Sequence, residues 1–430
     1  MTVRDERPPR DLGQTTACIR RPGLCISVTM HHEPSSAFPS APARVANVVV
    51  AQREFPSAFR LLVPALERQD PLADALVSWA DARGVSPTLV LDEALALRRS
   101  GQAHPSPEAN ALVDQLLSRP TWVDPEILER GGAALGRAAL TGGLVLAFRS
   151  LISGYAAPAG NKPLAFSGRL EAGAARRLDE TGRFVRAVSQ PGGLLPTGEG
   201  FLLTARVRLM HAGVRRLLHR SGRWDAAAWS QPINQHDMLA TVLLFSSVWL
   251  GGCRLLGVEF TADEARHHMH LWRYVGFLMG VEEALLPDGE AHATNLQGFL
   301  RLTQHAPDDD SRRLVRALMT PPPRPAERDA ASRARDLIAP ALSSYLHALC
   351  HVLLDEDLCT GLGIPAAPAS RWVRRASAVR GAAGRLVLAH PTLDRLASQW
   401  GDGYWRRSVG RVAGTLQYDY ATPTRLGAHP

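Results

Sequence analysis

Apolar residues recur every three or four positions along most of the chain from about Ala58 onward, which places them on one side of an α-helix. Helices are predicted at 170–188, 203–218, 234–256 and 261–280, and throughout a second helical region at about 331–415. Asn234 is a capping residue for the third of these, and Thr261 with Glu264 forms a capping box for the fourth. No alternating run typical of a strand is long enough to compete, so the sequence predicts an all-α protein.

Segments rich in proline, serine and glycine divide the helical pattern. The predicted organisation is a disordered tail at 1–45, a main helical domain at 46–305, a loop-rich linker at 306–330, a C-terminal helical region packed on the core at 331–415, and a tail at 416–430. The apolar run at 131–151 is rich in glycine and alanine. Such small residues allow another helix, or a flat ligand, to approach the backbone closely.

The net charge of +8 does not indicate a nucleic-acid partner. Lys162 is the only lysine, and the arginines are spread along the chain, often beside Asp or Glu. No basic block with interleaved aromatic residues is present, so we expect no nucleic-acid binding. The five cysteines are scattered without a paired spacing, which favours a reducing compartment.

The membrane signals are weak. The N-terminal region lacks a continuous apolar stretch, and the most apolar run, 238–253, is shorter than the roughly 20 residues that span a bilayer. We therefore expect a cytoplasmic protein without an integral membrane span. No oligomeric state follows from the sequence.

The helix at 203–218 carries a histidine beside an apolar stripe. The stripe consists of Leu203, Val207, Met210, Val214, Leu217 and Leu218. His211 lies at its edge, with Thr204, Arg208 and Arg215 on the same side. Haem needs this combination: apolar side chains for the porphyrin, a neutral imidazole for the iron, and cations for the propionates. The alternative is that His211 is an ordinary boundary residue and the arginines are solvated.

The preceding helix places Arg177 and Thr181, four residues apart, among apolar side chains. A buried arginine is costly without a partner, and above a haem these two residues could donate hydrogen bonds to dioxygen. Equally, Arg177 could pair with Asp179 or Glu180 at the surface.

An ordered series of motifs carries a family resemblance. They are LISGY at 151–155, TARVRLMHAGVR at 204–215, WD at 224–225, PINQHDML at 232–239 and LWRYVGFLMGV at 271–281. Together with the Arg177 helix, they make residues 130–290 resemble the family of latex-clearing proteins (rubber oxygenases) and the mycophenolic-acid-pathway oxygenase, MpaB.

The resemblance implies a helical fold with a globin-like core, additional helices and one b-type haem. It implies that His211 is the proximal iron ligand and that Arg177 and Thr181 form the distal polar site. The chemistry it implies is dioxygen-dependent cleavage of a carbon–carbon double bond in an isoprenoid chain.

Two departures concern the general base. Rubber-cleaving relatives carry a glutamate upstream of the distal arginine, whereas no Asp or Glu occurs here between Glu129 and Glu171, and Asn161 lies near the expected place. They also carry a lysine before the distal threonine, where this chain has Glu180. The haem-binding residues therefore transfer better than the substrate or the base.

Two rival interpretations remain open. Glu264 and His267 have the spacing of a carboxylate-bridged di-metal site, but this Glu-x-x-His motif occurs once. We interpret His267, His268 and His270 as a solvated face, and the pair His347 and His351 as packing residues. The other rival is a haem carrier or sensor, which needs His211 but no distal pair.

The sequence thus predicts a haem b-dependent oxygenase that uses dioxygen to oxidise a small apolar, unsaturated substrate. The residues expected to bind the cofactor are His211, Thr204, Arg208 and Arg215, with His211 on the metal. Arg177 and Thr181 are the expected catalytic pair.

Overall fold

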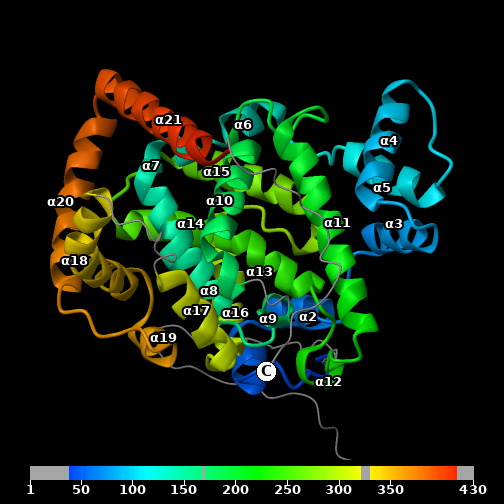
Figure 1. Cartoon of the computed structure of the whole chain (residues 1–430), viewed down its shortest axis with the longest axis horizontal. Helices are drawn as coiled ribbons and strands as arrows, with labels where there is room; N and C mark the ends of the chain where they lie inside the picture. Colours follow the sequence, from blue (N-terminus) through cyan, green and yellow to red (C-terminus); the bar gives the residue numbers. More distant parts are fainter. Residues whose placement is uncertain (1–37, 167–169, 321–329, 414–430) are drawn as a thin grey trace, which may run out of the picture. The chain divides into compact units, whose positions relative to one another are not determined.

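The computed structural model describes residues 38–166, 170–320 and 330–413, and every regular element in these ranges is helical (Figure 1). The predicted all-α class is confirmed. The first elements are α1 (Val48–Glu54), α2 (Pro56–Ala65), α3 (Pro71–Ala82), α4 (Pro87–Arg99), α5 (Pro107–Leu117), α6 (Pro125–Arg130), α7 (Ala133–Val145), the π-helix η1 (Leu146–Leu151), α8 (Ile152–Tyr155) and α9 (Lys162–Phe166).

The central elements are α10 (Leu170–Ser189), α11 (Glu199–Arg220), α12 (Ala226–Trp229), α13 (Gln235–Phe245), α14 (Ser247–Leu255), α15 (Ala262–Leu278) and the 3-10 helix η2 (Glu283–Leu285). The last elements are α16 (Glu290–Thr303), α17 (Asp309–Met319), α18 (Ala330–Leu353), α19 (Glu356–Gly361), α20 (Ser370–Leu388) and α21 (Pro391–Ala413).

Both predicted helix caps are present. The Asn234 side chain accepts a hydrogen bond from the backbone N–H of Asp237 at 2.9 Å, and Thr261 and Glu264 form a complete capping box. The long helix predicted at 234–256 is instead two helices, α13 and α14, which meet at Ser246. The Ser246 hydroxyl donates to the carbonyl of Val242 at 2.9 Å, a local bond that competes with a continuous helix.

The glycine- and alanine-rich run at 131–151 forms α7 and η1 and is closely covered by other helices. The indole of Trp249 lies against Gly142 and donates to its carbonyl at 3.0 Å, and a β-carbon on Gly142 would lie 2.9 Å from that ring. On another side of α7, Gly401 of α21 packs against the backbone of Gly136. The expected close approach is therefore made by two helices.

The PINQHDML motif joins segments that are distant in the sequence. The side chain of Gln235 donates to the carbonyls of Gln69 and Gly280, both at 2.9 Å. Asp237 forms an ion pair with Arg44 at 2.6 Å. Arg44 falls in the segment predicted as a disordered tail, yet it is buried, so packed structure begins before residue 46. Residues 1–37 lie outside the described part.

Residues 40–430 group as one unit, in which the C-terminal helices are continuous with the main domain. The indole of Trp405 in α21 donates to the carbonyl of Leu135 in α7 at 2.9 Å. The predicted linker contains α17, and residues 321–329 and 414–430 lie outside the described part.

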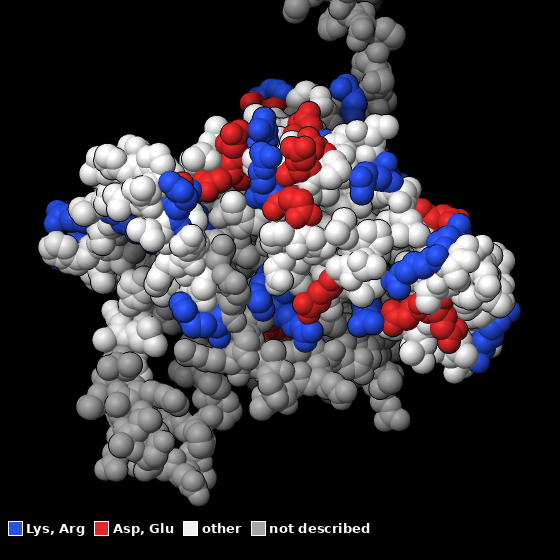
Figure 2. All heavy atoms as spheres, turned by 90° about the horizontal axis from the view of Figure 1, so that it is seen from above, with Lys and Arg blue, Asp and Glu red and all other residues white. Residues whose placement is uncertain are grey.

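Two helical stretches, Pro125–Tyr155 and Gln235–Leu255, are long and apolar enough to cross a membrane, but 67% and 56% of their most apolar windows are buried inside the protein. This burial is typical of core helices in a large helical fold. The view in Figure 2 shows blue and red side chains interspersed over much of the described surface.

Candidate functional site

The predicted haem-binding histidine lies on one arm of a helical hairpin formed by α10 and α11. Three glycines make the corner tight, because a β-carbon on Gly193, Gly198 or Gly200 would lie 2.6 Å or less from a backbone oxygen. At Gly200 the neighbours are the carbonyl of Ala187 and the α-carbon of Val188. The start of α11 is therefore in direct contact with the end of α10.

This contact sets which residues of α10 and α11 lie at equal distances from the corner. His211 lies eleven residues beyond Gly200, and position 177 lies eleven residues before Val188. Eleven residues make about three full helical turns and about 16 Å of rise. Positions 211 and 177 are therefore at the same height in the hairpin, each on the side of its helix that makes the corner contact.

His211 is half-buried among apolar side chains. Its Nδ1 atom is shielded from solvent. Val207, Met210 and Val214, its neighbours on α11, are also only half-buried. Residues in the middle of a long helix with this intermediate exposure can border a space that a ligand fills. An imidazole among apolar neighbours has the chemistry that haem iron and porphyrin require.

The two arginines predicted to meet haem propionates are engaged with α3 and the residue that precedes it. Arg208 makes a bidentate pair with Asp70, with nitrogen–oxygen distances of 2.6 and 2.9 Å, and Arg215 pairs with Asp74 at 2.7 Å. Both arginines are almost fully buried. Their guanidinium groups therefore fix α11 to α3 in this structure.

Gly280, which follows α15, makes room for the Arg208–Asp70 pair. Its φ of +87° is in the region that favours glycine, and a β-carbon there would lie 2.6 Å from atoms of both partners. The fourth predicted cofactor residue, Thr204, is fully buried and donates its hydroxyl to the carbonyl of Gly200 at 2.7 Å. This bond lies within the first turns of α11.

The predicted distal pair lies on α10. The side chain of Arg177 lies outside the described residues, whereas Thr181 is half-buried. Phe184, three residues after Thr181 and on the same side of α10, lies 6.3 Å from the ring of Trp272 in α15. Trp272 in turn stacks on Phe245 of α13 at 4.9 Å. The helix face that carries Thr181 therefore borders an aromatic cluster.

Trp272 is a further candidate, which lies in the LWRYVGFLMGV motif without any sequence signal that distinguishes it from a core residue. It is 2% exposed, and its indole N–H has no hydrogen-bond acceptor among the described residues. A buried donor without an acceptor is unfavourable by about 1–3 kcal/mol and is uncommon in native proteins. Its ring lies beside Phe184, on the Thr181 side of α10.

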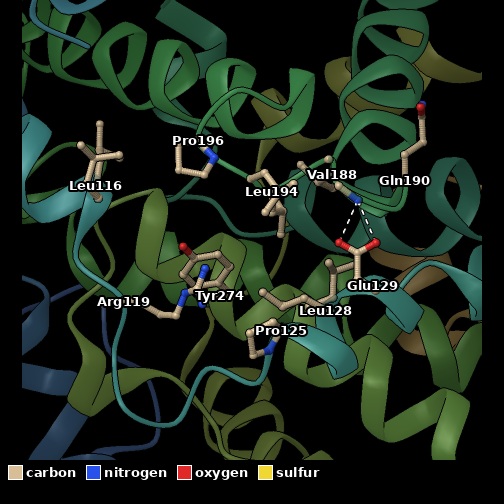
Figure 3. Close-up of a pocket in the computed structure, with 15 residues that line it drawn as sticks. Leu116, Arg119, Pro125, Leu128, Glu129, Val188, Gln190, Leu194, Pro196 and Tyr274 are labelled. Atoms are coloured by element: carbon tan, nitrogen blue, oxygen red, sulfur yellow. Dashed lines mark hydrogen bonds between the residues drawn. The ribbon is translucent and has the colours of Figure 1, made fainter. Parts of the chain in front are cut away.

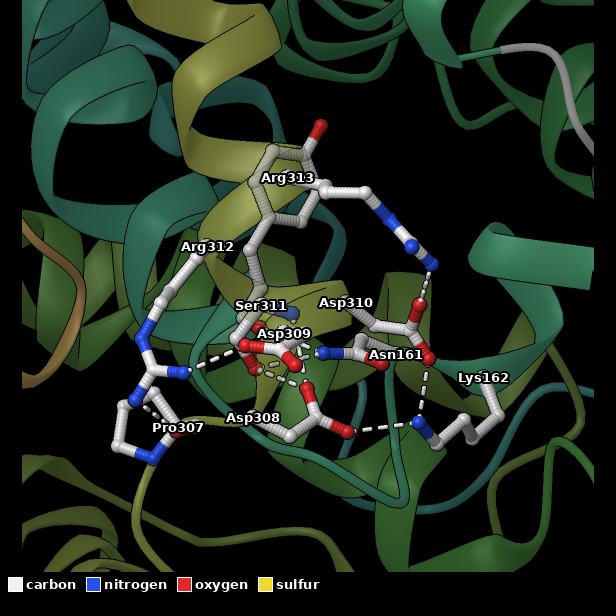
Figure 4. Close-up of polar contacts among 10 residues, drawn as sticks. Asn161, Lys162, Pro307, Asp308, Asp309, Asp310, Ser311, Arg312 and Arg313 are labelled. Atoms are coloured by element: carbon white, nitrogen blue, oxygen red, sulfur yellow. Dashed lines mark hydrogen bonds and ion pairs between the residues drawn. The ribbon is translucent and has the colours of Figure 1, made fainter. Parts of the chain in front are cut away.

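Asn161, near the place where relatives carry a glutamate, belongs to a polar network between α9 and α17 (Figure 4). Its amide donates to the carbonyl of Tyr155 at 2.7 Å and to the hydroxyl of Ser311 at 2.9 Å. The adjacent Lys162 pairs with Asp308 at 2.6 Å and with Asp310. A neutral amide held in this way joins helices and supplies no general base.

Asp179 on α10 does not replace the missing glutamate on geometric grounds. Burial and the nearby Glu180 raise the pKa of Asp179, and its Oδ2 atom is shielded from solvent. Residue 179 is, however, two positions from both 177 and 181, about 160–200° around the helix. It lies on the opposite side of α10 from the predicted distal pair.

A separate hollow of about 60 Å³ lies between α5, α6, α15 and the corner of the hairpin (Figure 3). Leu116, Leu128, Leu194 and Tyr274 line it. Both carboxylate oxygens of Glu129 accept the backbone N–H of Gly192 at 3.0 Å. Glu129 therefore secures the corner that joins α10 to α11, and neither His211 nor Thr181 lines this hollow.

The alternative of a carboxylate-bridged di-metal site depends on Glu264, whose carboxylate has other partners. Glu264 closes the capping box and pairs with Arg137 at 2.6 Å, so its carboxylate is already occupied. Among the described residues, no group of three or more histidine, cysteine or acidic side chains could hold a metal ion.

The solvated-face interpretation of the α15 histidines was wrong for two of them, because α15 packs against α6 and α7. His267 and His268 are buried, and the ring of His268 stacks on Trp249 at 4.6 Å. His351 agrees with the packing interpretation: its ring nitrogens contact Glu356 and the carbonyl of Pro365, both at 2.9 Å.

Comparisons with known proteins point to one family. The family model described as "ER-bound oxygenase mpaB/B'/Rubber oxygenase, catalytic domain" matches residues 131–388. The rubber oxygenase of Streptomyces sp. (strain K30) is 22% identical over 252 residues, which are 57% of this chain and 60% of that protein. The chain thus matches about three fifths of the length of this curated relative.

The fold is also similar to a solved structure. The latex clearing protein LCP in its closed state matches with a TM-score of 0.52 and 19% sequence identity. The match covers 79% of this chain and 91% of that one. It supports the similarity of the helical architecture.

Proposed function

The chain belongs to the MpaB and rubber oxygenase catalytic-domain family, and on that basis we propose that it is a haem b-dependent oxygenase. It uses dioxygen to oxidise an apolar, unsaturated substrate of isoprenoid-like chemistry. The cleavage of a carbon–carbon double bond is the reaction that we propose for it. We propose a cytoplasmic location.

The observation that carries the proposal is the position of His211 in the α10–α11 hairpin. It is half-buried between apolar neighbours and stands at the same helical level as position 177. An iron-binding imidazole needs a hydrophobic setting that keeps it neutral and oriented. His211 is half-buried on this helix, whereas His219, eight residues farther along α11, is exposed.

The residues of this chain fit the cofactor in distinct roles. His211 would bind the iron, and the haem would supply the redox chemistry that activates dioxygen. Arg208 and Arg215 orient the histidine indirectly, by holding α11 on the aspartates of the α3 segment. Preorganisation of this kind keeps a ligand in place without contacting the cofactor.

The polar groups of α10 and α15 would have a separate role. The hydroxyl of Thr181 and the guanidinium of Arg177 are donors for a substrate oxygen that gains negative charge, as the family resemblance implies. The Trp272 N–H, which lacks an acceptor among the described residues, is a third donor. Phe184 and Phe245 provide apolar surface that excludes water near these donors.

The first test is an absorption spectrum with a pyridine-haemochrome assay after expression with ample haem. The wild-type protein should show a Soret band, and His211→Ala should lose most of it because the iron loses its protein ligand. His219→Ala, an exposed histidine on the same helix, is the matched control and should keep the band. A wild-type protein without a Soret band, or a His211→Ala variant with full haem content, would contradict the proposal.

The same material separates an oxygenase from a haem carrier or sensor. The double variant Arg177→Met/Thr181→Val should retain haem but lose oxygen consumption with an isoprenoid substrate. Substrate-dependent oxygen uptake that is unchanged in this variant would argue against the catalytic pair. A carrier would show no such uptake in the wild type.

A further inference from the structure

The outer side of α20 is an exposed apolar surface with positive charge. Counting 100° per residue, Trp372, Val379 and Leu386 form one stripe on the side away from Gly381, which is buried. Three alanines extend this side, namely Ala376, Ala382 and Ala383. We call this surface the α20 outer face.

Its large residues are well exposed. The side chains of Trp372, Val379 and Leu386 are 56%, 72% and 66% accessible. Single exposed apolar residues need no explanation, but a continuous stripe along a helix about 28 Å long is characteristic of an interaction surface. In Figure 1, α20 lies at the edge of the described helices, with α18 on its inner side.

The helix that carries this face contains five arginines and no acidic residue. Three of the arginines are used within the protein: Arg374 contacts the carbonyl of His351, Arg380 the hydroxyl of Thr141, and Arg385 the carboxylate of Glu259. They fasten α20 to the rest of the molecule and leave its apolar side outward.

The other two arginines border the apolar stripe. The guanidinium groups of Arg371 and Arg375 lie 5.5 and 4.9 Å from the ring centre of Trp372, and neither forms an ion pair with a described residue. In Figure 2 the end of the molecule where α20 lies is largely white and blue. A partner for this surface must therefore accept apolar side chains and supply negative charge.

The next helix adds a second stripe. Leu393, Leu396 and Trp400 lie on one side of α21, and Leu396 and Trp400 are both 62% exposed. They point away from Gly401 and Trp405, which pack on α7. Two consecutive helices thus present leucine and tryptophan outward.

A second copy of the chain is a poor occupant. In a two-fold symmetric pair the same patch meets itself, so Arg371 and Arg375 of both copies would be brought together without an acidic residue on α20 to neutralise them. An anionic lipid surface has the opposite properties, because its headgroups attract guanidinium groups and its acyl region accepts tryptophan and aliphatic side chains.

We propose that the α20 outer face, continued by the α21 stripe, docks the protein on an anionic membrane surface. The helix lies in the plane of the interface, with Trp372, Val379 and Leu386 in the headgroup–acyl boundary and Arg371 and Arg375 on phosphate or carboxylate groups. This inference is independent of haem binding. Docking would bring the protein to a membrane, in which an apolar substrate is concentrated.

The test is flotation of the whole protein with vesicles of phosphatidylcholine containing phosphatidylserine, compared with phosphatidylcholine alone. The wild type should float with the anionic vesicles, and binding should decrease at high salt because screening shortens the range of charge attraction. Arg371→Glu/Arg375→Glu should weaken binding by about ten-fold or more, since each basic residue near such a surface contributes roughly 1 kcal/mol. Val379→Asp/Leu386→Asp should also weaken it strongly.

Matched controls use exposed residues elsewhere. Arg53→Glu/Arg60→Glu changes the net charge equally on α1 and α2, and Leu89→Asp replaces a leucine on α4 that is 62% exposed. Both should bind vesicles like the wild type. Binding that falls equally in the charge control, or no binding to anionic vesicles at all, would overturn the proposal. The proposal would also be overturned if the wild type formed a dimer without lipid and only the Val379→Asp/Leu386→Asp variant lost that dimer.

Discussion

Arginine side chains in this protein act mainly through pairs inside the fold. Arg208 is the clearest case, because both its guanidinium and the Asp70 carboxylate are almost fully buried. The sequence predicted that Arg208 neighbours His211 on one helix. The pattern of that helix could not reveal that Arg208 pairs with an aspartate 138 residues away in the sequence. Only the tertiary contact between α3 and α11 decides this.

Replacing Arg208 with alanine should destabilise the protein by about 3–5 kcal/mol, since it leaves the Asp70 charge buried without a partner. Arg206→Ala on the same helix removes a half-exposed pair with Asp92 and should change stability by at most about 1 kcal/mol. Denaturant titrations of the two variants measure the difference. If Arg208→Ala were as stable as wild type and had lost only haem, a direct role on the cofactor would be favoured instead.

At the scale of elements, the helices that build the site are held by close backbone approaches. The corner of α10 and α11 depends on Gly193, Gly198 and Gly200, and the docking of α21 depends on Gly401. The sequence predicted α10 at 170–188 and α11 at 203–218, whereas α11 begins at Glu199, and it predicted α21 only as part of a longer helical region. It missed the break at Ser246 because apolar periodicity continues across it, while a local side-chain bond and packing end α13.

Gly401→Ala should dislodge α21 from α7, because its new β-carbon would lie 1.7 Å from the carbonyl oxygen of Gly136. We expect a loss of about 1–3 kcal/mol and faster proteolysis in the C-terminal helices. Gly403→Ala is the control: its β-carbon would meet only the flexible side chain of Arg407 at 3.3 Å, and alanine favours helix by about 1 kcal/mol. Equal protease resistance in both variants would show that α21 is not held at Gly401.

At the scale of the whole molecule, buried histidines tie global stability to pH. Burial lowers the pKa of His268 to about 4, even though the carbonyl of Phe245 contacts its ring. The unfolded state therefore binds a proton more readily below pH about 6.5, the ordinary value for histidine. Stability from this group is complete above that pH and is lost as the pH falls towards 4.

The wild type should lose about 2 kcal/mol of stability to this group between pH 7 and pH 5. His268→Gln removes the titration and should flatten that part of the pH profile, although it also lowers stability at pH 7 by disturbing the stack on Trp249. His390→Gln, at an exposed position, should leave the profile unchanged. Urea midpoints at pH 7 and pH 5 measure this change of stability. An equal change in the wild type, His268→Gln and His390→Gln would refute the role of His268.

The sequence by itself determined the helical class, the capping residues, the family and the helix on which His211 lies. These properties depend on residues close together in the chain, or on motifs whose order survives divergence. Tertiary structure alone decided that Arg208 and Arg215 form ion pairs with aspartates and that His268 is buried. It also decided that the Trp272 N–H has no acceptor among the described residues. Partners brought together across more than a hundred residues leave no period in the sequence, so packing rather than pattern assigns them.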